Sequence, residues 1–187
     1  MINIISGLLK KSNLFFPNKF FKFFNFKPTP FYIKKKVFDW IGSFNNIYCL
    51  DIFSCTGNLG FEAASRGCRL SILLEKNKKF FFYLKKNFYK FSLKNVKIFN
   101  CNFFYFIKKF NLKNTFFNLI FIDSSYIILN DLIKSLKIIL KILKPNSYIY
   151  IETIFNIELF IKKFSFKFIV LKNFFFGKIN FFLLKTL

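Results

Sequence analysis

Residues 51–68, DIFSCTGNLGFEAASRGC, follow a short apolar run and contain the features that decide the fold. Residues 47–53 are predicted to form a buried strand, and residues 58–66 are predicted to form a helix that a glycine ends. The turn between them is rich in small residues, and Gly57 and Gly60 allow a backbone to approach a ligand closely. The first turn of the helix also offers unpaired N–H groups. This stretch therefore predicts a strand, a turn and a helix with a binding site at the turn.

The rest of the chain repeats this alternation of short apolar strands and longer amphipathic helices. Strands are predicted at residues 70–74, 96–99, 118–122 and 148–151, and helices at residues 76–91, 104–110 and 129–143, the last stopped by Pro145. This alternation predicts a parallel sheet with helices on both faces. Residues 164–174 and 179–184 flank Gly177 and predict a closing antiparallel pair.

The first 45 residues depart from this pattern and hold three of the four prolines. Residues 2–5 and 14–16 are apolar runs that predict a small hairpin, and residues 31–41 predict a helix that Gly42 ends. We therefore expect two parts, a hairpin-and-helix extension at residues 1–45 and an α/β domain at residues 46–187.

The composition excludes several classes of protein. The 187 residues include no histidine, so a histidine base or histidine metal ligand is excluded. The four cysteines form no C-x-x-C pair, so a zinc ribbon or redox motif is unsupported, and with no signal pattern we expect reduced thiols in the cytoplasm. The longest stretch without a charged residue, residues 40–50, has eleven residues. A membrane-spanning helix needs ~20, so we expect no membrane partner.

The charge balance favours a polyanionic partner. There are 31 Lys and Arg against 8 Asp and Glu, for a net charge of +23. Such a charge attracts phosphate over a long range, so RNA is the favoured partner. The lysines are spread along the whole chain.

No heptad or repeat suggests assembly, so we expect a monomer.

Polar residues follow each predicted strand at its carboxyl end, where open parallel sheets bind ligands. Asp51 and the small-residue turn follow the first strand, and Glu75 follows the second, where a carboxylate can accept hydrogen bonds from ribose hydroxyls. Together these two features indicate a nucleoside-bearing cofactor. Asp123 follows the fourth strand and Tyr126 lies three residues later. A carboxylate, the next backbone carbonyl and an aromatic ring suit the exocyclic amine of a flipped base, with no metal required.

These motifs resemble the first motif of class I S-adenosylmethionine-dependent methyltransferases. The closer resemblance is to the RsmD family, which methylates the N2 amine of a guanine in small-subunit (16S) ribosomal RNA. That family typically reads D-x-F-A-G-S-G-x-L-G-x-E-A-x-S-R-G where this chain has residues 51–67. Further matches follow in the family's order: INIISG at residues 2–7, KPT at 27–29 with IKKKVFDWI at 33–41, DSSY at 123–126 and IYIE at 149–152.

The resemblance implies a fold, a cofactor and a partner. The fold would be a Rossmann-like, seven-stranded class I methyltransferase sheet with a small N-terminal hairpin and helix extension. The cofactor would be S-adenosylmethionine, and the partner would be ribosomal RNA or the small ribosomal subunit, which the extension would face.

The resemblance also implies roles residue by residue. Around the methionine portion of the cofactor would lie Asp51, Ser54, Thr56, Gly57 and Gly60, with Glu75 on the ribose and Asn102 and Phe103 flanking the adenine. Asp123 and the Ser124 carbonyl would orient the guanine amine while Tyr126 stacks on the base. Thr29 and Lys34 would lie over the mouth of the site, and Lys10, Lys11 and Lys27 would meet RNA phosphates.

Three departures from the family pattern bear on activity. Cys55 stands where the family has its first glycine, and it is strained if the turn requires a positive φ. Lys35 replaces a glutamate, so a polar contact near the site is lost. Ser124 and Ser125 replace two prolines, which keeps the backbone carbonyl but removes rigidity worth about 0.4–1 kcal/mol at each position. The sequence therefore predicts a weakened enzyme rather than an inactive one.

Other functions are compatible with parts of this pattern. A non-catalytic RNA-binding or ribosome-assembly factor would keep the fold and the lysines without methyl transfer. A nicotinamide-dependent oxidoreductase is disfavoured, because Cys55 interrupts any G-x-G-x-x-G motif and DSSY follows the fourth strand. Among methyltransferases, an enzyme acting on an amine of another RNA base or of DNA adenine is a further alternative.

Overall fold

A computed structural model of the chain describes residues 2–17, 29–110, 117–123, 128–164 and 167–187. The strands are β1 (Ile2–Asn3), β2 (Asn13–Leu14), β3 (Tyr48–Asp51), β4 (Leu70–Leu74), β5 (Val96–Phe99), β6 (Phe117–Asp123), β7 (Leu143–Thr153), β8 (Phe168–Phe176) and β9 (Ile179–Thr186). The helices are α2 (Phe31–Ile41), α3 (Asn58–Ser65), α4 (Lys78–Phe91), α5 (Phe103–Phe110), α6 (Leu129–Ile139) and α7 (Ile157–Lys163).

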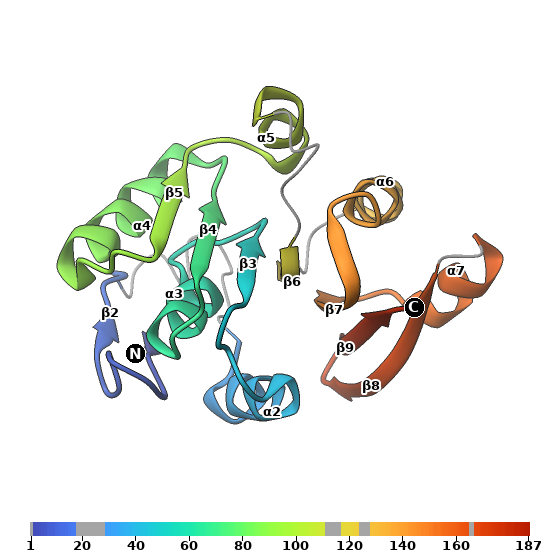
Figure 1. The fold of residues 1–187 in the computed structure, drawn as a ribbon, viewed down its shortest axis with the longest axis horizontal. Helices are drawn as coiled ribbons and strands as arrows, with labels where there is room; N and C mark the ends of the chain where they lie inside the picture. The colour runs from blue at the N-terminus through green and yellow to red at the C-terminus, as the bar shows by residue number, and fades with distance from the viewer. Residues whose placement is uncertain (1, 18–28, 111–116, 124–127, 165–166) are drawn as a thin grey trace.

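The main sheet has seven strands in the order β5-β4-β3-β6-β7-β9-β8, and only β9 runs against the others (Figure 1). This order and these directions confirm the predicted parallel sheet with a closing antiparallel pair. The order reverses between β3 and β6, because the chain continues from β3 to β4 and β5 on one side and then returns to place β6 and β7 on the other. Such a reversal opens a crevice at the carboxyl ends of the strands, where ligands bind in sheets of this type.

Helices cover both faces of the sheet. The face that carries α2, α3 and α4 also carries the N-terminal hairpin, and its core includes Phe38, Phe61 and Leu84. The opposite face carries α5, α6 and α7, and its core includes Phe106 and Leu136. Side chains along each strand alternate between these two cores, as the pleat of a sheet requires.

Most elements agree with those predicted from the sequence, but the segment before β7 does not. The helix predicted at residues 129–143 ends at Ile139, and Leu143 already begins β7, so Pro145 lies within a strand instead of stopping a helix. Leu143 pairs with Phe117, and the register then shifts before the pairs that follow. Proline lacks an N–H, so it fits where the ladder of hydrogen bonds is interrupted. The helix α7, which Asn156 caps, was not predicted.

The N-terminal hairpin packs against the end of α3. Its strands pair Ile2 with Leu14, and the Leu8 N–H donates to the Ser65 carbonyl at 2.8 Å. Gly7 has a φ of 80°, and a Cβ there would lie 1.8 Å from the Ser65 oxygen, so only glycine fits. Because α3 starts at the carboxyl edge of the sheet, its last residues lie toward the opposite edge.

No helix in the part of the chain that the structure describes is both long and apolar enough to cross a membrane.

Replacing Gly7 with alanine tests how tightly the hairpin is held. Gly67 has a similar φ of 90° but open space around its Cβ position, so Gly67→Ala is the matched control. Both substitutions carry a conformational cost of about 1–2 kcal/mol. We expect Gly7→Ala to lose about 1–3 kcal/mol more in the free energy of unfolding, because it adds a clash. Urea denaturation of both variants measures the difference, and equal losses would contradict the close packing.

Candidate active site

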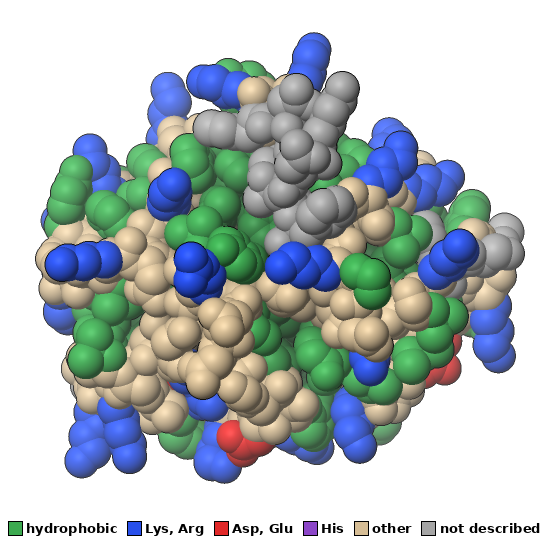
Figure 2. All heavy atoms as spheres, in the orientation of Figure 1, with side chains coloured by type: hydrophobic (Ala, Val, Ile, Leu, Met, Phe, Trp, Pro, Cys, Tyr) green, Lys and Arg blue, Asp and Glu red, His purple; other side chains and the backbone are tan. Residues whose placement is uncertain are grey.

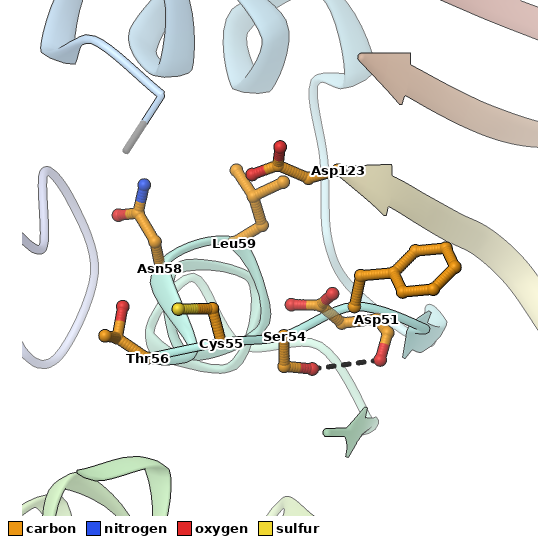
Figure 3. Close-up of a pocket in the computed structure, with 8 residues that line it drawn as sticks. Asp51, Ser54, Cys55, Thr56, Asn58, Leu59 and Asp123 are labelled. Carbon is orange, nitrogen blue, oxygen red and sulfur yellow. Dashed lines mark hydrogen bonds between the residues drawn. The ribbon is translucent and has the colours of Figure 1, made fainter. Parts of the chain in front are cut away.

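A hollow of about 300 Å³, part of it open solvent, lies at the carboxyl edge of the sheet between β3 and β6. Its lining residues come from the end of β3, the turn after it, the start of α3 and the end of β6: Asp51, Phe53, Ser54, Cys55, Thr56, Asn58, Leu59 and Asp123 (Figure 3). The structure therefore brings together Asp51, Ser54, Thr56 and Asp123 from the predicted site. The hollow lies where the strand order reverses, as expected for a ligand site in this kind of sheet.

The turn after β3 is held by hydrogen bonds at both of its ends. The Ser54 hydroxyl donates to the Asp51 carbonyl at 2.9 Å, and the Gly60 N–H donates to Asp51 Oδ2 at 3.2 Å. Cys55 has a φ of 47°, so the left-handed conformation foreseen for this position is present on a non-glycine residue. Such a conformation costs about 1–2 kcal/mol for a residue with a Cβ.

The two glycines of this turn serve packing. A Cβ on Gly57 would lie 2.4 Å from the Phe61 ring, and one on Gly60 would lie 2.5 Å from Leu73. Both positions therefore face the core, and neither residue lines the hollow. Their missing side chains make room for neighbouring apolar groups, and the expected approach of a ligand to the backbone at these glycines stays a prediction.

Glu75, which was predicted to bind ribose hydroxyls, holds the turn in this structure. Its side chain is buried, and it accepts hydrogen bonds from the Cys55 N–H at 2.9 Å and the Asn77 N–H at 2.7 Å. Burial raises the pKa of this carboxyl, and the two backbone donors oppose that rise. Glu75 does not line the hollow itself.

The two residues predicted beside the adenine have structural roles around α5. Asn102 accepts a hydrogen bond from the Tyr105 N–H at 2.8 Å, so it caps the first turn of that helix. Phe103 is 2 % exposed and packs in the core on the face of α5, α6 and α7. The burial of this ring argues against the predicted contact with an adenine.

Asp123 reaches the hollow from the end of β6. In the sheet register, Asp51 of β3 lies opposite Phe121 of β6, and Asp123 of β6 lies opposite Glu152 of β7. Because Phe121 belongs to the core on the α2 side, the pleat directs all three carboxyls to that same face. Ser124 and Tyr126, the other two predicted catalytic residues, and Lys27 lie outside the described residues.

Thr29 and Lys34 do not lie over the mouth of the site as predicted. The Thr29 hydroxyl is buried and contacts Glu152 Oε1 at 2.7 Å and Asp123 Oδ2 at 3.2 Å. Lys34 is 2 % exposed, and its Nζ lies 3.2 Å from Glu62 Oε2. A lysine that is buried in an ion pair is not open to solvent at the mouth of a site, so the structure argues against the predicted place of Lys34.

Lys34 instead orients a residue of the hollow. Its Nζ donates to Asn58 Oδ1 at 2.8 Å, which fixes the amide so that Nδ2 is the other, free end. Since a lysine can only donate, the assignment of the two amide atoms follows from this contact.

Glu152 and Tyr150 are site residues that the sequence interpretation missed. The Tyr150 hydroxyl donates to Glu152 Oε1 at 2.8 Å, and both side chains are buried behind Asp123. A signal for Glu152 was present, because it ends a predicted strand as Asp51, Glu75 and Asp123 do.

The hollow is acidic although the protein is strongly basic. Burial, with a further contribution from the charge of Asp123, raises the pKa of Asp51 to about 8. Burial also raises the pKa of Asp123 to about 6. Among the described residues, no Lys or Arg forms an ion pair with either group. The site therefore favours a ligand that carries a positive charge.

Three buried polar atoms of the hollow have no hydrogen-bond partner among the described residues: Asp51 Oδ1, Thr56 Oγ1 and Asn58 Nδ2. Buried polar atoms are nearly always paired in folded proteins. One is a carboxylate acceptor, one an amide donor and one a hydroxyl, which suits a group with both an ammonium and a carboxylate. The methionine end of S-adenosylmethionine carries these two groups, so the residues present fit it.

Comparisons with known proteins identify relatives of this chain. The family model described as Conserved hypothetical protein 95 matches residues 2–180. Ribosomal RNA small subunit methyltransferase D of Buchnera aphidicola from Acyrthosiphon pisum is 39% identical over 155 residues, which cover 81% of this chain and 77% of the relative.

Two solved structures share the fold. The Escherichia coli protein yhhF superposes with a TM-score of 0.80 at 22% identity, covering 99% of this chain and 97% of its own. A ribosomal protein L11 methylase of Lactobacillus delbrueckii gives a TM-score of 0.68 at 10% identity, covering 86% and 80%.

The sheet order, the crevice at the β3 turn and the acidic hollow define the chain as a class I S-adenosylmethionine-dependent methyltransferase. The family match and the identity to the Buchnera protein are more specific. The chain belongs to the ribosomal RNA small subunit methyltransferase D family.

The strain at Cys55 can be measured by comparing two substitutions that both remove the thiol. Alanine is normally the more stable of the pair, because glycine loses more freedom on folding. At a φ of 47° we expect Cys55→Gly to be more stable than Cys55→Ala by about 1 kcal/mol. Thermal or urea unfolding measures the order, and a more stable alanine variant would show that the turn is unstrained.

The raised pKa of Asp51 predicts how cofactor binding depends on pH. A bound cation favours the ionised carboxylate, so binding lowers the pKa of Asp51 from about 8 and releases a proton. We expect the affinity for S-adenosylmethionine to rise with pH up to about 8, by as much as about tenfold per unit. Calorimetry over this pH range measures the affinity. The control is Asp51→Asn, in which the pH dependence reports only the titration of the cofactor's own groups. An identical pH dependence in both proteins would refute the role of Asp51.

Proposed function

We propose that the protein transfers the methyl group of S-adenosylmethionine to the exocyclic N2 amine of a guanine in small-subunit (16S) ribosomal RNA. The observation that carries this proposal is the set of three buried polar atoms without a partner in the described part of the chain, which lie in the same hollow as Asp123. The hollow thus offers a place for the cofactor's amino-acid end beside a carboxylate suited to an amine.

The residues of the chain divide the work between binding and orientation. Asp51, Thr56 and Asn58 would hold the amino-acid end of the cofactor, and Glu75 holds the turn that carries them. When bound, the cofactor would supply the electrophilic methyl group of its sulfonium sulfur, which would leave as a neutral thioether when the methyl group is transferred. Asp123 accepts hydrogen bonds from the substrate amine, which turns the nitrogen lone pair toward the methyl group, and it accepts the proton that the amine loses.

The protonation state of Asp123 sets the pH range of this chemistry. Only the ionised carboxylate can accept both an amine hydrogen bond and the departing proton. Because the pKa of Asp123 is raised to about 6, activity rises with pH through this value.

The RNA partner is supported by charge. Basic side chains are spread around the whole outline of the face in Figure 2, with few acidic ones between them. Lys10 and Lys11 are exposed on the hairpin beside the end of α3, away from the carboxyl edge. They would therefore contact RNA at a distance from the target base, and contacts of this kind position the substrate without reading its sequence. We further propose that the protein acts as a monomer in the cytoplasm, on ribosomal RNA or the small subunit.

Substitution of Asp123 tests the function. We expect wild-type protein to transfer radiolabelled methyl groups to unmethylated small subunits, and mass mapping to place them on a guanine N2. Asp123→Ala should lose at least about 100-fold in transfer while cofactor affinity changes little. Glu75→Ala should instead weaken cofactor binding first, because it releases the turn.

The control is Asp39→Ala, which removes an exposed carboxylate that pairs with Lys35 on the surface of α2 and should leave transfer unchanged. Absence of transfer by the wild type at any cofactor concentration would overturn the proposal in favour of a non-catalytic RNA-binding factor. Methyl groups on a different base would overturn the guanine assignment alone.

A further inference from the structure

Glu152 lies at the end of β7, directly beside Asp123 in the register of the sheet. It is 3 % exposed and does not line the hollow, so it has no direct contact with a ligand there. Two hydroxyls reach its Oε1 atom, that of Thr29 at 2.7 Å and that of Tyr150 at 2.8 Å. The Thr29 hydroxyl also lies 3.2 Å from Asp123 Oδ2 and so bridges the two carboxyls.

The two carboxyls compete for a single hydroxyl hydrogen and share no cation among the described residues. The Thr29 hydroxyl has a single hydrogen but lies within hydrogen-bond distance of an oxygen from each carboxyl. No Lys or Arg in the described parts of the chain forms an ion pair with Asp123 or Glu152. Two adjacent buried carboxylates without a cation cannot both be ionised at neutral pH, so the pair holds a proton.

The surroundings of the pair decide which carboxyl keeps that proton. Burial and the charge of Asp123 raise the pKa of Glu152 well above its usual value. The pKa of Asp123 is raised less, to about 6, because hydrogen bonds from Thr29 and Glu152 favour its charged form. At neutral pH Glu152 is therefore the protonated partner and Asp123 the charged one.

Each element packed around Asp123 contributes a defined group. The segment before α2 contributes the Thr29 hydroxyl, and β7 contributes Glu152 with Tyr150 behind it. The end of β3 contributes the Asp51 carboxyl, and the following turn contributes the Cys55 thiol. Of the described groups, only Thr29 and Glu152 donate to Asp123, and an ionised Asp51 would repel its charge.

We propose that Glu152 is a positioning residue, which donates its proton to Asp123 and thereby keeps that carboxylate charged and turned toward the substrate amine. The inference rests on the proposed function, in which Asp123 receives the amine. It assigns a task to the Y-x-E segment of β7, which the cofactor and substrate contacts leave unexplained.

Two substitutions at Glu152 separate this task from mere support of the fold. Glutamine keeps an N–H donor toward Asp123 and an acceptor for Thr29 and Tyr150, whereas alanine removes both. In the pH profile of kcat/KM, we expect the acidic limb of Glu152→Ala to move up by about one pH unit. That shift corresponds to a loss of about fivefold to tenfold in rate near pH 6, with recovery at higher pH. Glu152→Gln should keep the wild-type limb.

Glu158→Ala is the matched control, since this partly exposed glutamate on α7, whose carboxylate accepts a hydrogen bond from Asn173, lies on a different element from Glu152 and should leave the limb in place. A Glu152→Ala limb that coincides with that of wild type would overturn the inference while leaving the proposed function intact.

Carbon-13 NMR titration of the wild-type side-chain carboxyls tests the same arrangement without activity or a variant. The chain has only 8 Asp and Glu residues, so each carboxyl signal can be assigned. We expect Asp123 to ionise at a lower pH than Glu152. The reverse order, or two ionised groups at pH 7, would overturn the inference even if the wild type showed no methyl transfer and the proposed function had failed.

Discussion

The pleat of the parallel sheet places Asp51, Asp123 and Glu152 on one face at the edge where β3, β6 and β7 end. Their mutual repulsion in a buried space is the constraint on which the rest of the site depends. None of the three is paired with a cation within the described residues, despite a net charge of +23. The site therefore keeps its carboxyls partly protonated and leaves room for the positive charge of the cofactor. Binding energy that would otherwise go to internal ion pairs is available to the ligand.

A second buried network connects the hairpin, α2 and α3. Glu62 accepts the N–H groups of Ile5 and Ser6 and pairs with Lys34 and Arg66. Buried ion pairs contribute little net stability because desolvation offsets their attraction, but breaking one partner is costly. Lys34 also fixes the Asn58 amide, so this network links the seating of the N-terminal extension to one wall of the hollow proposed for the cofactor. The extension is thus part of the active site's construction as well as a candidate surface for RNA.

Much of the fold could be predicted because strand and helix periods are distinct where elements are long and well bounded. The helix α2 and the strands β4 and β5 have the predicted limits, since glycines, prolines and polar residues mark their ends. The boundary between α6 and β7 was wrong because residues 138–143, apolar except for Lys141, suit either structure, and Pro145 was interpreted as a stop. In the site, Asp51 and Asp123 could be predicted because ligands bind at the carboxyl ends of parallel strands. Burial of Lys34 and Thr29 could not be predicted, because it depends on partners 28 and 94 residues away along the chain, Glu62 and Asp123. The pairing of Glu152 with Asp123 depends likewise on sheet register, which local sequence does not reveal.

The same acidic surroundings act on the one sulfur that faces the hollow. Burial and the nearby charges of Glu75 and Asp123 raise the pKa of the Cys55 thiol well above its usual value. A thiolate is a far stronger nucleophile than a thiol, and a thiolate beside a sulfonium would compete with the nucleic-acid amine for the methyl group. Because the thiol is the weaker nucleophile, a raised pKa at Cys55 disfavours its methylation by a cofactor bound in the hollow. It allows a cysteine to occupy a position next to an alkylating agent without diverting the reaction from its intended acceptor.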